Sequence, residues 1–121
     1  MKHNKKTNAI VIGGGITAQA CALVLAEAGY SVNLIGNFKK TFGGIQLAPN
    51  GFSALKRLNL IDEISKKIIP LNSILIKNLD SNIRISEIKV RNDQKYASIP
   101  RNDLQNILLK KIHIQKNIII K

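Results

Sequence analysis

The apolar positions near the start of the chain predict a strand, a helix and a second strand. Residues 9–12 are an apolar run rich in branched side chains, as expected of a strand buried on both faces of a parallel sheet. Residues 18–28 are mostly small or apolar, which predicts a helix that packs closely on that sheet. Gly29 is expected to end this helix in a left-handed conformation, and residues 30–35 return as the second strand.

The middle of the chain predicts a short extended segment followed by two helices. Residues 45–51 predict a short extended piece that runs into a proline turn. A helix is expected from Gly51, with Asn59 as its left-handed stop, and a second short helix is expected to be closed by Pro70. The apolar positions that define these two helices are Phe52, Leu55, Leu58, Ile61, Ile64 and Ile68.

The last third contains alternation, then one more helix, then one more strand. Residues 73–90 alternate as in a hairpin, with a turn at residues 80–82. Asn102 or Asp103 is expected to cap a following helix, whose apolar positions are Leu104, Ile107, Leu108 and Ile112. Residues 118–120 begin another apolar strand. Strands that alternate with helices predict an α/β fold built on a Rossmann-like parallel sheet.

A glycine-rich turn joins the first strand to the first helix. Its sequence, Gly-Gly-Gly-Ile-Thr-Ala, fits the pattern G-x-G-x-x-G/A. Gly13 allows the tight turn, Gly15 lets a pyrophosphate approach the backbone, and Ala18 is small enough for the helix to lie close to the strand. The strand before it and the helix after it predict a dinucleotide bound at the helix N-terminus. The candidate cofactor-binding residues of this turn are Gly13, Gly14, Gly15, Ile16, Thr17 and Ala18.

The end of the second strand lacks the acidic residue that binds the ribose hydroxyls in such units. Gly36 and Asn37 occupy that place, and no Asp or Glu occurs between Glu27 and Asp62. A hydrogen bond to a charged group contributes about 1.5–3 kcal/mol. Its absence therefore predicts adenosine binding that is weaker by about tenfold to a hundredfold. A glutamate in place of Gly36 is expected to strengthen adenine-nucleotide binding.

Composition is typical of a globular protein with an excess of positive charge. The chain has 121 residues, of which 45% are hydrophobic, and its net charge is +12. Lysines outnumber arginines fifteen to four and accompany isoleucines and asparagines along the whole chain, as expected of an AT-rich genome. Two tyrosines and three phenylalanines offer no platform for stacking bases. We therefore expect no nucleic-acid partner.

The cysteine, the histidines and the N-terminal segment indicate the compartment and the kinds of site to expect. Cys21, the only cysteine, falls among alanines, which predicts a buried structural thiol and is compatible with a reducing cytoplasm. His3 and His113 are expected to be structural or solvated, so no metal site and no catalytic residue is predicted. Residues 1–8 are a basic N-terminal tail rather than a signal peptide, and no segment has the length of a transmembrane span. A cytoplasmic location is expected, and peripheral association with the inner membrane stays open.

Three segments in order suggest a particular family. GGGITA is followed by GIQLAPNGFSALKRLNLIDEI and then by IPRNDLQNILLKKI. This arrangement resembles the N-terminal part of the FAD-dependent aromatic-ring monooxygenases, which include salicylate hydroxylase-like enzymes and ubiquinone-biosynthesis hydroxylases. The resemblance runs from residue 8 to the end of the chain. Residues 44–51 and 99–104 are its most specific parts, because a dehydrogenase that binds only NAD has no reason to carry them.

The resemblance implies a fold, a cofactor and a reaction. Residues 9–121 would be the N-terminal portion of an FAD-binding domain of the glutathione-reductase type, with residues 73–90 as a hairpin toward the substrate side. Gly13, Gly15 and Ala18 would hold the FAD pyrophosphate, Gln46 would approach the flavin side, and Arg101 would contact phosphate or ribitol oxygens. The related enzymes use NAD(P)H and O2 to hydroxylate an aromatic or quinone-precursor ring.

The departures from this family leave three hypotheses open. The family's Asp-Gly fingerprint and its later Gly-Asp motif are absent, so the chain is expected to be a truncated enzyme that is inactive alone. It would be either a remnant or one half of a split enzyme that a downstream polypeptide completes. A second hypothesis is a stand-alone NAD(P)-binding module in which Lys39 and Lys40 meet a 2′-phosphate. The third is a non-catalytic basic interaction protein.

Overall fold

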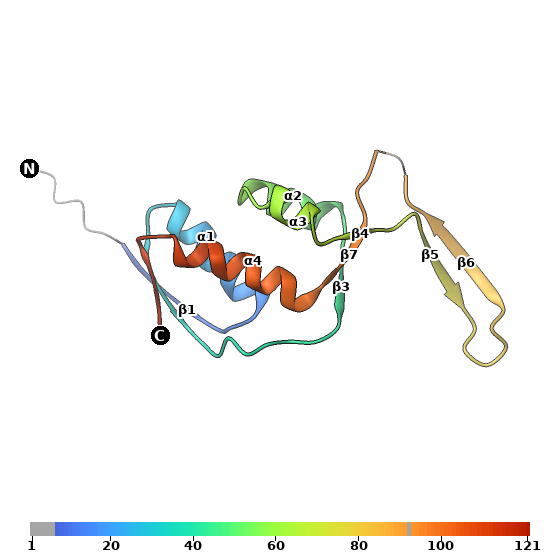
Figure 1. Ribbon diagram of the computed structural model, residues 1–121, viewed down its shortest axis with the longest axis horizontal. Helices are drawn as coiled ribbons and strands as arrows, with labels where there is room; N and C mark the ends of the chain where they lie inside the picture. Colours follow the sequence, from blue (N-terminus) through green and yellow to red (C-terminus); the bar gives the residue numbers. More distant parts are fainter. Residues whose placement is uncertain (1–6, 92) are drawn as a thin grey trace, which may run out of the picture. The chain divides into compact units, whose positions relative to one another are not determined.

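A computed structural model describes residues 7–91 and 93–121. The basic tail expected at residues 1–8 lies outside the described residues, except for Thr7 and Asn8. The chain divides into two compact units. The first unit comprises the chain up to Gly43 together with Arg101–Lys121, and the second unit is Gly44–Pro100 (Figure 1).

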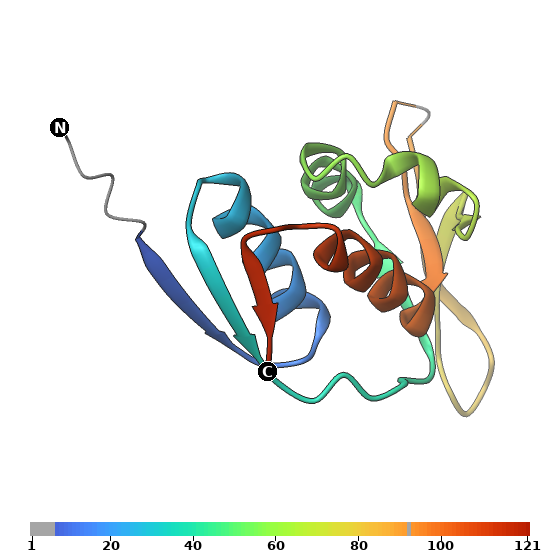
Figure 2. The same cartoon turned by 60° about the vertical axis from the view of Figure 1, so that its left-hand side comes forward.

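The first unit is built on a parallel sheet. Its strands are β1 (Asn8–Ile12), β2 (Ser31–Ile35) and β8 (Ile118–Ile120), hydrogen-bonded in the order β1-β2-β8. All three run in the same direction, as the strands in Figure 2 show. The predicted α/β fold with a parallel sheet is therefore confirmed, and so is the expected last strand.

Two helices complete the first unit. Helix α1 (Ile16–Glu27) packs on β1 and β2, and helix α4 (Arg101–His113) packs against α1 (Figure 2). Gly29 ends α1 with φ of 91°, and the Tyr30 N–H donates to the carbonyl of Leu25, so the predicted left-handed stop is confirmed. The buried apolar side chains of this unit are Ala22, Leu23, Ala26, Val32, Leu34, Leu104, Ile107, Leu108 and Ile112.

Two expectations for these helices are wrong. Helix α4 begins at Arg101, whose N–H donates to the carbonyl of Gly43 at 2.9 Å, so Asn102 and Asp103 lie inside the first turn rather than at the cap. Cys21 is exposed on α1 rather than buried. The alanine-rich helix is apolar around its whole circumference, so its sequence does not indicate which face packs on the sheet.

The second unit contains a small antiparallel sheet and two helices. Strands β3 (Gly44–Leu47), β7 (Ala97–Pro100) and β4 (Ile69–Pro70) pair in that order. Helix α2 (Pro49–Arg57) and helix α3 (Ile61–Ser65) follow β3. The buried apolar side chains of this unit are Leu47, Phe52, Leu55, Leu58, Leu60, Ile64, Ala97 and Ile99.

The helices of the second unit differ from their predictions at their ends. α2 starts at Pro49, two residues before the expected Gly51, because the fixed φ of proline suits the first position of a helix. Asn59 has φ of 54° and stops α2 as predicted. α3 ends at Ser65 instead of continuing through Ile68, and Pro70 belongs to β4 rather than to a helix end.

A separate two-stranded hairpin lies between β4 and β7 in the sequence. β5 (Ser73–Lys77) and β6 (Arg84–Lys89) pair antiparallel, with an irregularity between Ile76 and Lys77. The side-chain oxygen of Asn78 accepts hydrogen bonds from the backbone N–H groups of Asp80 and Ser81, at 3.0 Å each, and so shapes the turn. The structure thus has a hairpin within residues 73–90.

Candidate functional site

The glycine turn lies at the carboxyl end of β1 and the N-terminus of α1. The Gly13 N–H donates to the carbonyl of Ile35 at 2.8 Å, which ties the turn to the end of β2. Gly13 has φ of 138°, a conformation that L side chains rarely adopt. A Cβ at Gly13 would lie 3.1 Å from the Cβ of Ala18, so the turn requires a glycine at one position and a small residue at the other.

Gly14 and Gly36 lie where two backbone segments touch. A Cβ at Gly14 would fall 1.9 Å from the carbonyl oxygen of Asn37. A Cβ at Gly36 would fall 2.5 Å from the carbonyl carbon of Gly13. The expectation that a glutamate at position 36 would restore a ribose acceptor is therefore contradicted, because position 36 has no space for any side chain.

Gly15 differs from its neighbours because open space lies beside it. Apart from Gly15 itself and its chain neighbours, the described residues place no heavy atom within 4 Å of the position that a Cβ would take. Gly15 is the N-cap of α1, with φ of −83° and ψ of 176°, and no side chain caps the helix there. The first N–H groups of a helix lack partners within the helix and carry partial positive charge. Open space at such an end fits a phosphate group.

Two buried glutamine side chains reach the glycine turn from opposite ends of the sequence. Gln19 is 0% exposed, and its Nε2 donates to the carbonyl oxygen of Gly14 at 2.9 Å. Gln105, on α4, is 5% exposed, and its Nε2 donates to the same oxygen at 3.4 Å. The hydroxyl of Thr41 donates in turn to Oε1 of Gln105. Both amides therefore share the Gly14 carbonyl as an acceptor.

Neither of these glutamines was predicted as a site residue from the sequence. One feature of the sequence sets Gln19 apart: it is a long polar residue in a helix whose other residues near the turn are mostly small or apolar. No such feature marks Gln105, because its contact with Gly14 spans 91 residues of sequence. Neither residue belongs to the G-x-G-x-x-G/A pattern.

The remaining candidates of the first unit lie around α4 and the loop after β2. Arg101 is exposed and is the first residue of α4. Lys39 and Lys40 are exposed in the loop, and the loop and α4 together line an open cavity of about 330 Å³. Among the described residues, those that line this cavity include no Asp or Glu, and they are Phe38, Lys39, Lys40, Asn102, Gln105, Asn106 and Leu109.

Gln46 belongs to the second unit, so it is not among the residues that the first unit brings together. It lies on β3 opposite Ser98 and is exposed. Its Oε1 accepts a hydrogen bond from the hydroxyl of Tyr96 at 3.4 Å. The other candidates for cofactor contact, from Gly13 to Ala18 and also Gly36 and Arg101, are in the first unit.

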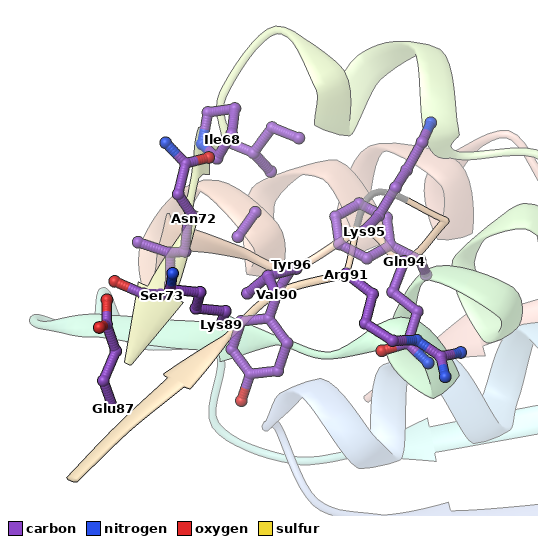
Figure 3. Close-up of a pocket in the computed structure, with 14 residues that line it drawn as sticks. Ile68, Asn72, Ser73, Glu87, Lys89, Val90, Arg91, Gln94, Lys95 and Tyr96 are labelled. Atoms are coloured by element: carbon purple, nitrogen blue, oxygen red, sulfur yellow. The ribbon is translucent and has the colours of Figure 1, made fainter. Parts of the chain in front are cut away.

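A larger cavity of about 660 Å³ lies in the second unit at the base of the hairpin (Figure 3). Phe52, Ile68 and Ala97 give it an apolar wall. Figure 3 shows the side chains of Arg91 and Lys95 pointing in opposite directions. The guanidinium of Arg91 also pairs with the carboxylate of Asp93 at 3.1 Å. The positive charges at this cavity therefore do not converge on one point.

Residues 7–91 and 93–121 contain neither a metal-binding cluster nor a helix that could span a membrane. No cluster of three or more His, Cys, Asp or Glu side chains there could hold a metal ion. None of the helices in these ranges combines the length and the apolar character that crossing a membrane requires.

Comparison with known sequences places the chain among relatives with related activities. No family model matches the chain. Kynurenine 3-monooxygenase of Legionella pneumophila (strain Corby) is 30% identical over 117 residues, which are 89% of this chain and 26% of that protein. The chain thus spans about a quarter of the length of this curated relative.

Solved structures share the fold. 2-Methyl-3-hydroxypyridine-5-carboxylic acid oxygenase matches with a TM-score of 0.82 and 21% identity, over 97% of this chain and 32% of that one. A probable FAD-dependent monooxygenase from Pseudomonas aeruginosa matches with a TM-score of 0.81 and 16% identity, over 94% of this chain and 32% of that one.

These comparisons define the class to which the chain is related. It has the fold found in part of the FAD-dependent monooxygenases. The resemblance predicted from the glycine turn and the two later segments is confirmed: the chain is homologous to part of the FAD-dependent aromatic-ring monooxygenases.

Proposed function

We propose that this chain carries the FAD-binding glycine turn of a flavoprotein monooxygenase. The intact enzyme would use NAD(P)H and O2 to hydroxylate an aromatic or quinone-precursor ring. The observation that carries the proposal is the open space beside Gly15 at the N-terminus of α1, next to a turn whose other glycines are tightly packed. The names of the relatives, a kynurenine monooxygenase and a pyridine-carboxylic acid oxygenase, support the reaction class.

The residues of the first unit fit a pyrophosphate. In this proposal the backbone from Gly13 to Ala18 holds the FAD pyrophosphate, and Arg101 supplies a positive charge from the start of α4. Gly36 contributes only its backbone, because a side chain there would collide with Gly13. FAD, when bound, supplies the redox chemistry, and the protein supplies binding and orientation. We propose that the whole domain is of the glutathione-reductase type.

Two features of the second unit are proposed to serve the flavin and the substrate. Gln46, exposed on β3, is the candidate for contact near the flavin. The cavity at the base of the hairpin supports a substrate role for residues 73–90, because its wall of Phe52, Ile68 and Ala97 suits an apolar ring.

A second candidate function is a site for NADP. It is favoured by one observation, the cavity of about 330 Å³ beside Lys39 and Lys40, whose lining residues include no acidic side chain. Two ammonium groups beside the end of β2 suit a 2′-phosphate, where an acid would repel it.

Titration of the purified chain with FAD, ADP and NADP tests the proposal. We expect FAD and ADP to bind more tightly than NADP. Gly15→Ala adds a methyl group to the open space without strain, because φ of −83° suits any residue. We expect it to weaken FAD binding by at least about tenfold, the effect of losing about 1.4 kcal/mol of contact with the pyrophosphate. Because alanine is a poorer N-cap than glycine, we also expect a loss of stability of about 0.5–1 kcal/mol.

Gly51→Ala is the matched control. Gly51 lies on α2, and a Cβ there would lie 3.7 Å from the side chain of Leu47 on β3, an ordinary contact in the second unit. The substitution should therefore leave the affinities for FAD, ADP and NADP unchanged. Tighter binding of NADP than of FAD, lost in a Lys39→Gln/Lys40→Gln variant, would replace the flavin proposal with the second candidate. Equal FAD binding by wild type and Gly15→Ala would show that the pyrophosphate does not lie at this turn.

A further inference from the structure

We propose that Gln19 and Gln105 act as positioning residues that hold the glycine turn in its phosphate-binding conformation. Both side-chain amides donate to one backbone atom, the carbonyl oxygen of Gly14, at 2.9 and 3.4 Å. The inference deepens the proposed function and rests on it, because the group to be positioned is the N–H that would meet the pyrophosphate.

Peptide geometry links the shared acceptor to the ligand. In a trans peptide the carbonyl of one residue and the N–H of the next point in opposite directions. The described residues contain no cis peptide bond. Fixing the Gly14 carbonyl toward the buried amides therefore makes the Gly15 N–H point away from them, in the opposite direction within the same peptide plane. Open space lies beside Gly15, so the amides hold a donor toward the place where a phosphate fits.

Gln19 makes this contact at a cost in stability. Its Oε1 is buried and has no hydrogen-bond partner among the described residues. An unsatisfied buried acceptor destabilises the folded state, and an apolar side chain of similar shape would avoid that penalty. A residue that only filled the space under α1 would not need an amide. The donor to Gly14 is therefore the property that distinguishes glutamine from an apolar residue at this position.

Gln105 links the same carbonyl to the loop after β2. The hydroxyl of Thr41 donates to Oε1 of Gln105, which leaves Nε2 to donate to Gly14. Gln105 also lines the cavity beside Lys39 and Lys40. The orientation of one amide thus joins the loop, α4 and the glycine turn within the first unit.

Methionine substitutions separate positioning from packing, because methionine matches the length of glutamine without its donor. The variants are Gln19→Met, Gln105→Met and the double variant. Gln115→Met is the control, since Gln115 lies after the end of α4 in the same unit. Each is measured for melting temperature, for FAD and ADP affinity, and for the amide resonances of Gly14 and Gly15 without nucleotide.

We expect Gln19→Met to weaken FAD and ADP binding by about tenfold, the size of one well-placed hydrogen bond. The melting temperature should stay equal or rise, because the unpaired Oε1 is removed. Gln105→Met should have a smaller effect, because its bond is longer, and the double variant should be non-additive, because both amides serve one acceptor. The Gly15 amide resonance should shift or broaden in these variants and stay unchanged in Gln115→Met.

Two results would overturn the inference. Parallel loss of melting temperature and affinity in Gln19→Met would show a packing role alone, and an unmoved Gly15 resonance would show that the amides do not hold the turn. The resonance measurement needs no ligand, so it separates this inference from the proposed function. If the wild-type chain binds no FAD, the proposed function fails, and the shift of the Gly15 resonance still decides whether the amides position the turn.

Discussion

At the scale of single residues, each of the three glycines of the turn meets a different structural requirement. Gly13 is needed for its positive φ, Gly14 for close approach to Asn37, and Gly15 for the open space beside it. The pattern G-x-G-x-x-G/A predicted the first and third reasons. It gave no information about Gly14, because the close approach depends on the loop that follows β2.

Gly36→Glu is expected to lower stability and to bring no gain in nucleotide affinity. A Cβ at this position would lie 2.5 Å from backbone of Gly13, so one strand end must move. Forcing extra atoms into a packed backbone contact costs about 1–3 kcal/mol. Urea denaturation measures the loss, and ADP titration measures the affinity. An increase in ADP affinity with unchanged stability would contradict the packing at this position.

Local sequence patterns predict only part of the candidate site. The turn and its flanking strand and helix follow from local sequence, since apolar periodicity and glycine spacing are local signals. Gln19 and Gln105 were not predicted, because a polar residue is usually expected at the surface. Their burial depends on one shared acceptor that only the folded chain places between them.

At the scale of elements, the order of strands and helices was predicted better than their ends. The alternation at residues 73–90 and the apolar run at residues 118–120 correspond to β5, β6 and β8. The predicted start of α4 was wrong because the backbone N–H of Arg101 donates to the carbonyl of Gly43, which is far away in sequence. That N–H therefore needs no side-chain cap. Exposure of Cys21 was also missed, because an alanine-rich helix has no distinct polar face.

Asn117 ties two elements together, and we expect Asn117→Ala to destabilise the first unit. Its Nδ2 donates to the carbonyls of Ala26 and Tyr30, each at 2.8 Å, and so joins the residue before β8 to the end of α1. Removing a donor shared by partly buried carbonyls costs about 1–3 kcal/mol. Thermal or urea denaturation measures the change. Asn106→Ala, at an exposed position of α4, is the control and should be near neutral.

At the scale of the whole chain, two surface properties oppose each other. One face of the parallel sheet carries exposed isoleucines around Asn33: Ile12 is 83% exposed and Ile10 is 67% exposed. Strand register places Ile35 beside Ile12, and Ile119 in the same row as Ile10. The net charge of +12 repels copies of the chain from one another. Contiguous exposed apolar surface favours association, whereas net charge opposes it.

We therefore expect the 121-residue chain to self-associate, and to do so more strongly as salt is added. Salt shortens the screening length from about 30 Å at 0.01 M to about 8 Å at 0.15 M, which weakens repulsion between copies and leaves apolar attraction intact. Sedimentation velocity across this range measures the change. Ile10→Thr/Ile12→Thr keeps branched residues in β1 and should shift the chain toward monomer.

The double variant Ile83→Thr/Ile114→Thr is the matched control for that experiment. Both residues are exposed, at 65% and 71%, and neither lies on the parallel sheet. The control removes the same chemical groups, so it should leave association unchanged if the sheet face is responsible. Dissociation of the associated copies on addition of salt would instead indicate that ionic contacts hold them together. Equal effects of the two double variants would indicate general hydrophobicity, and the sheet face would then have no special role in association.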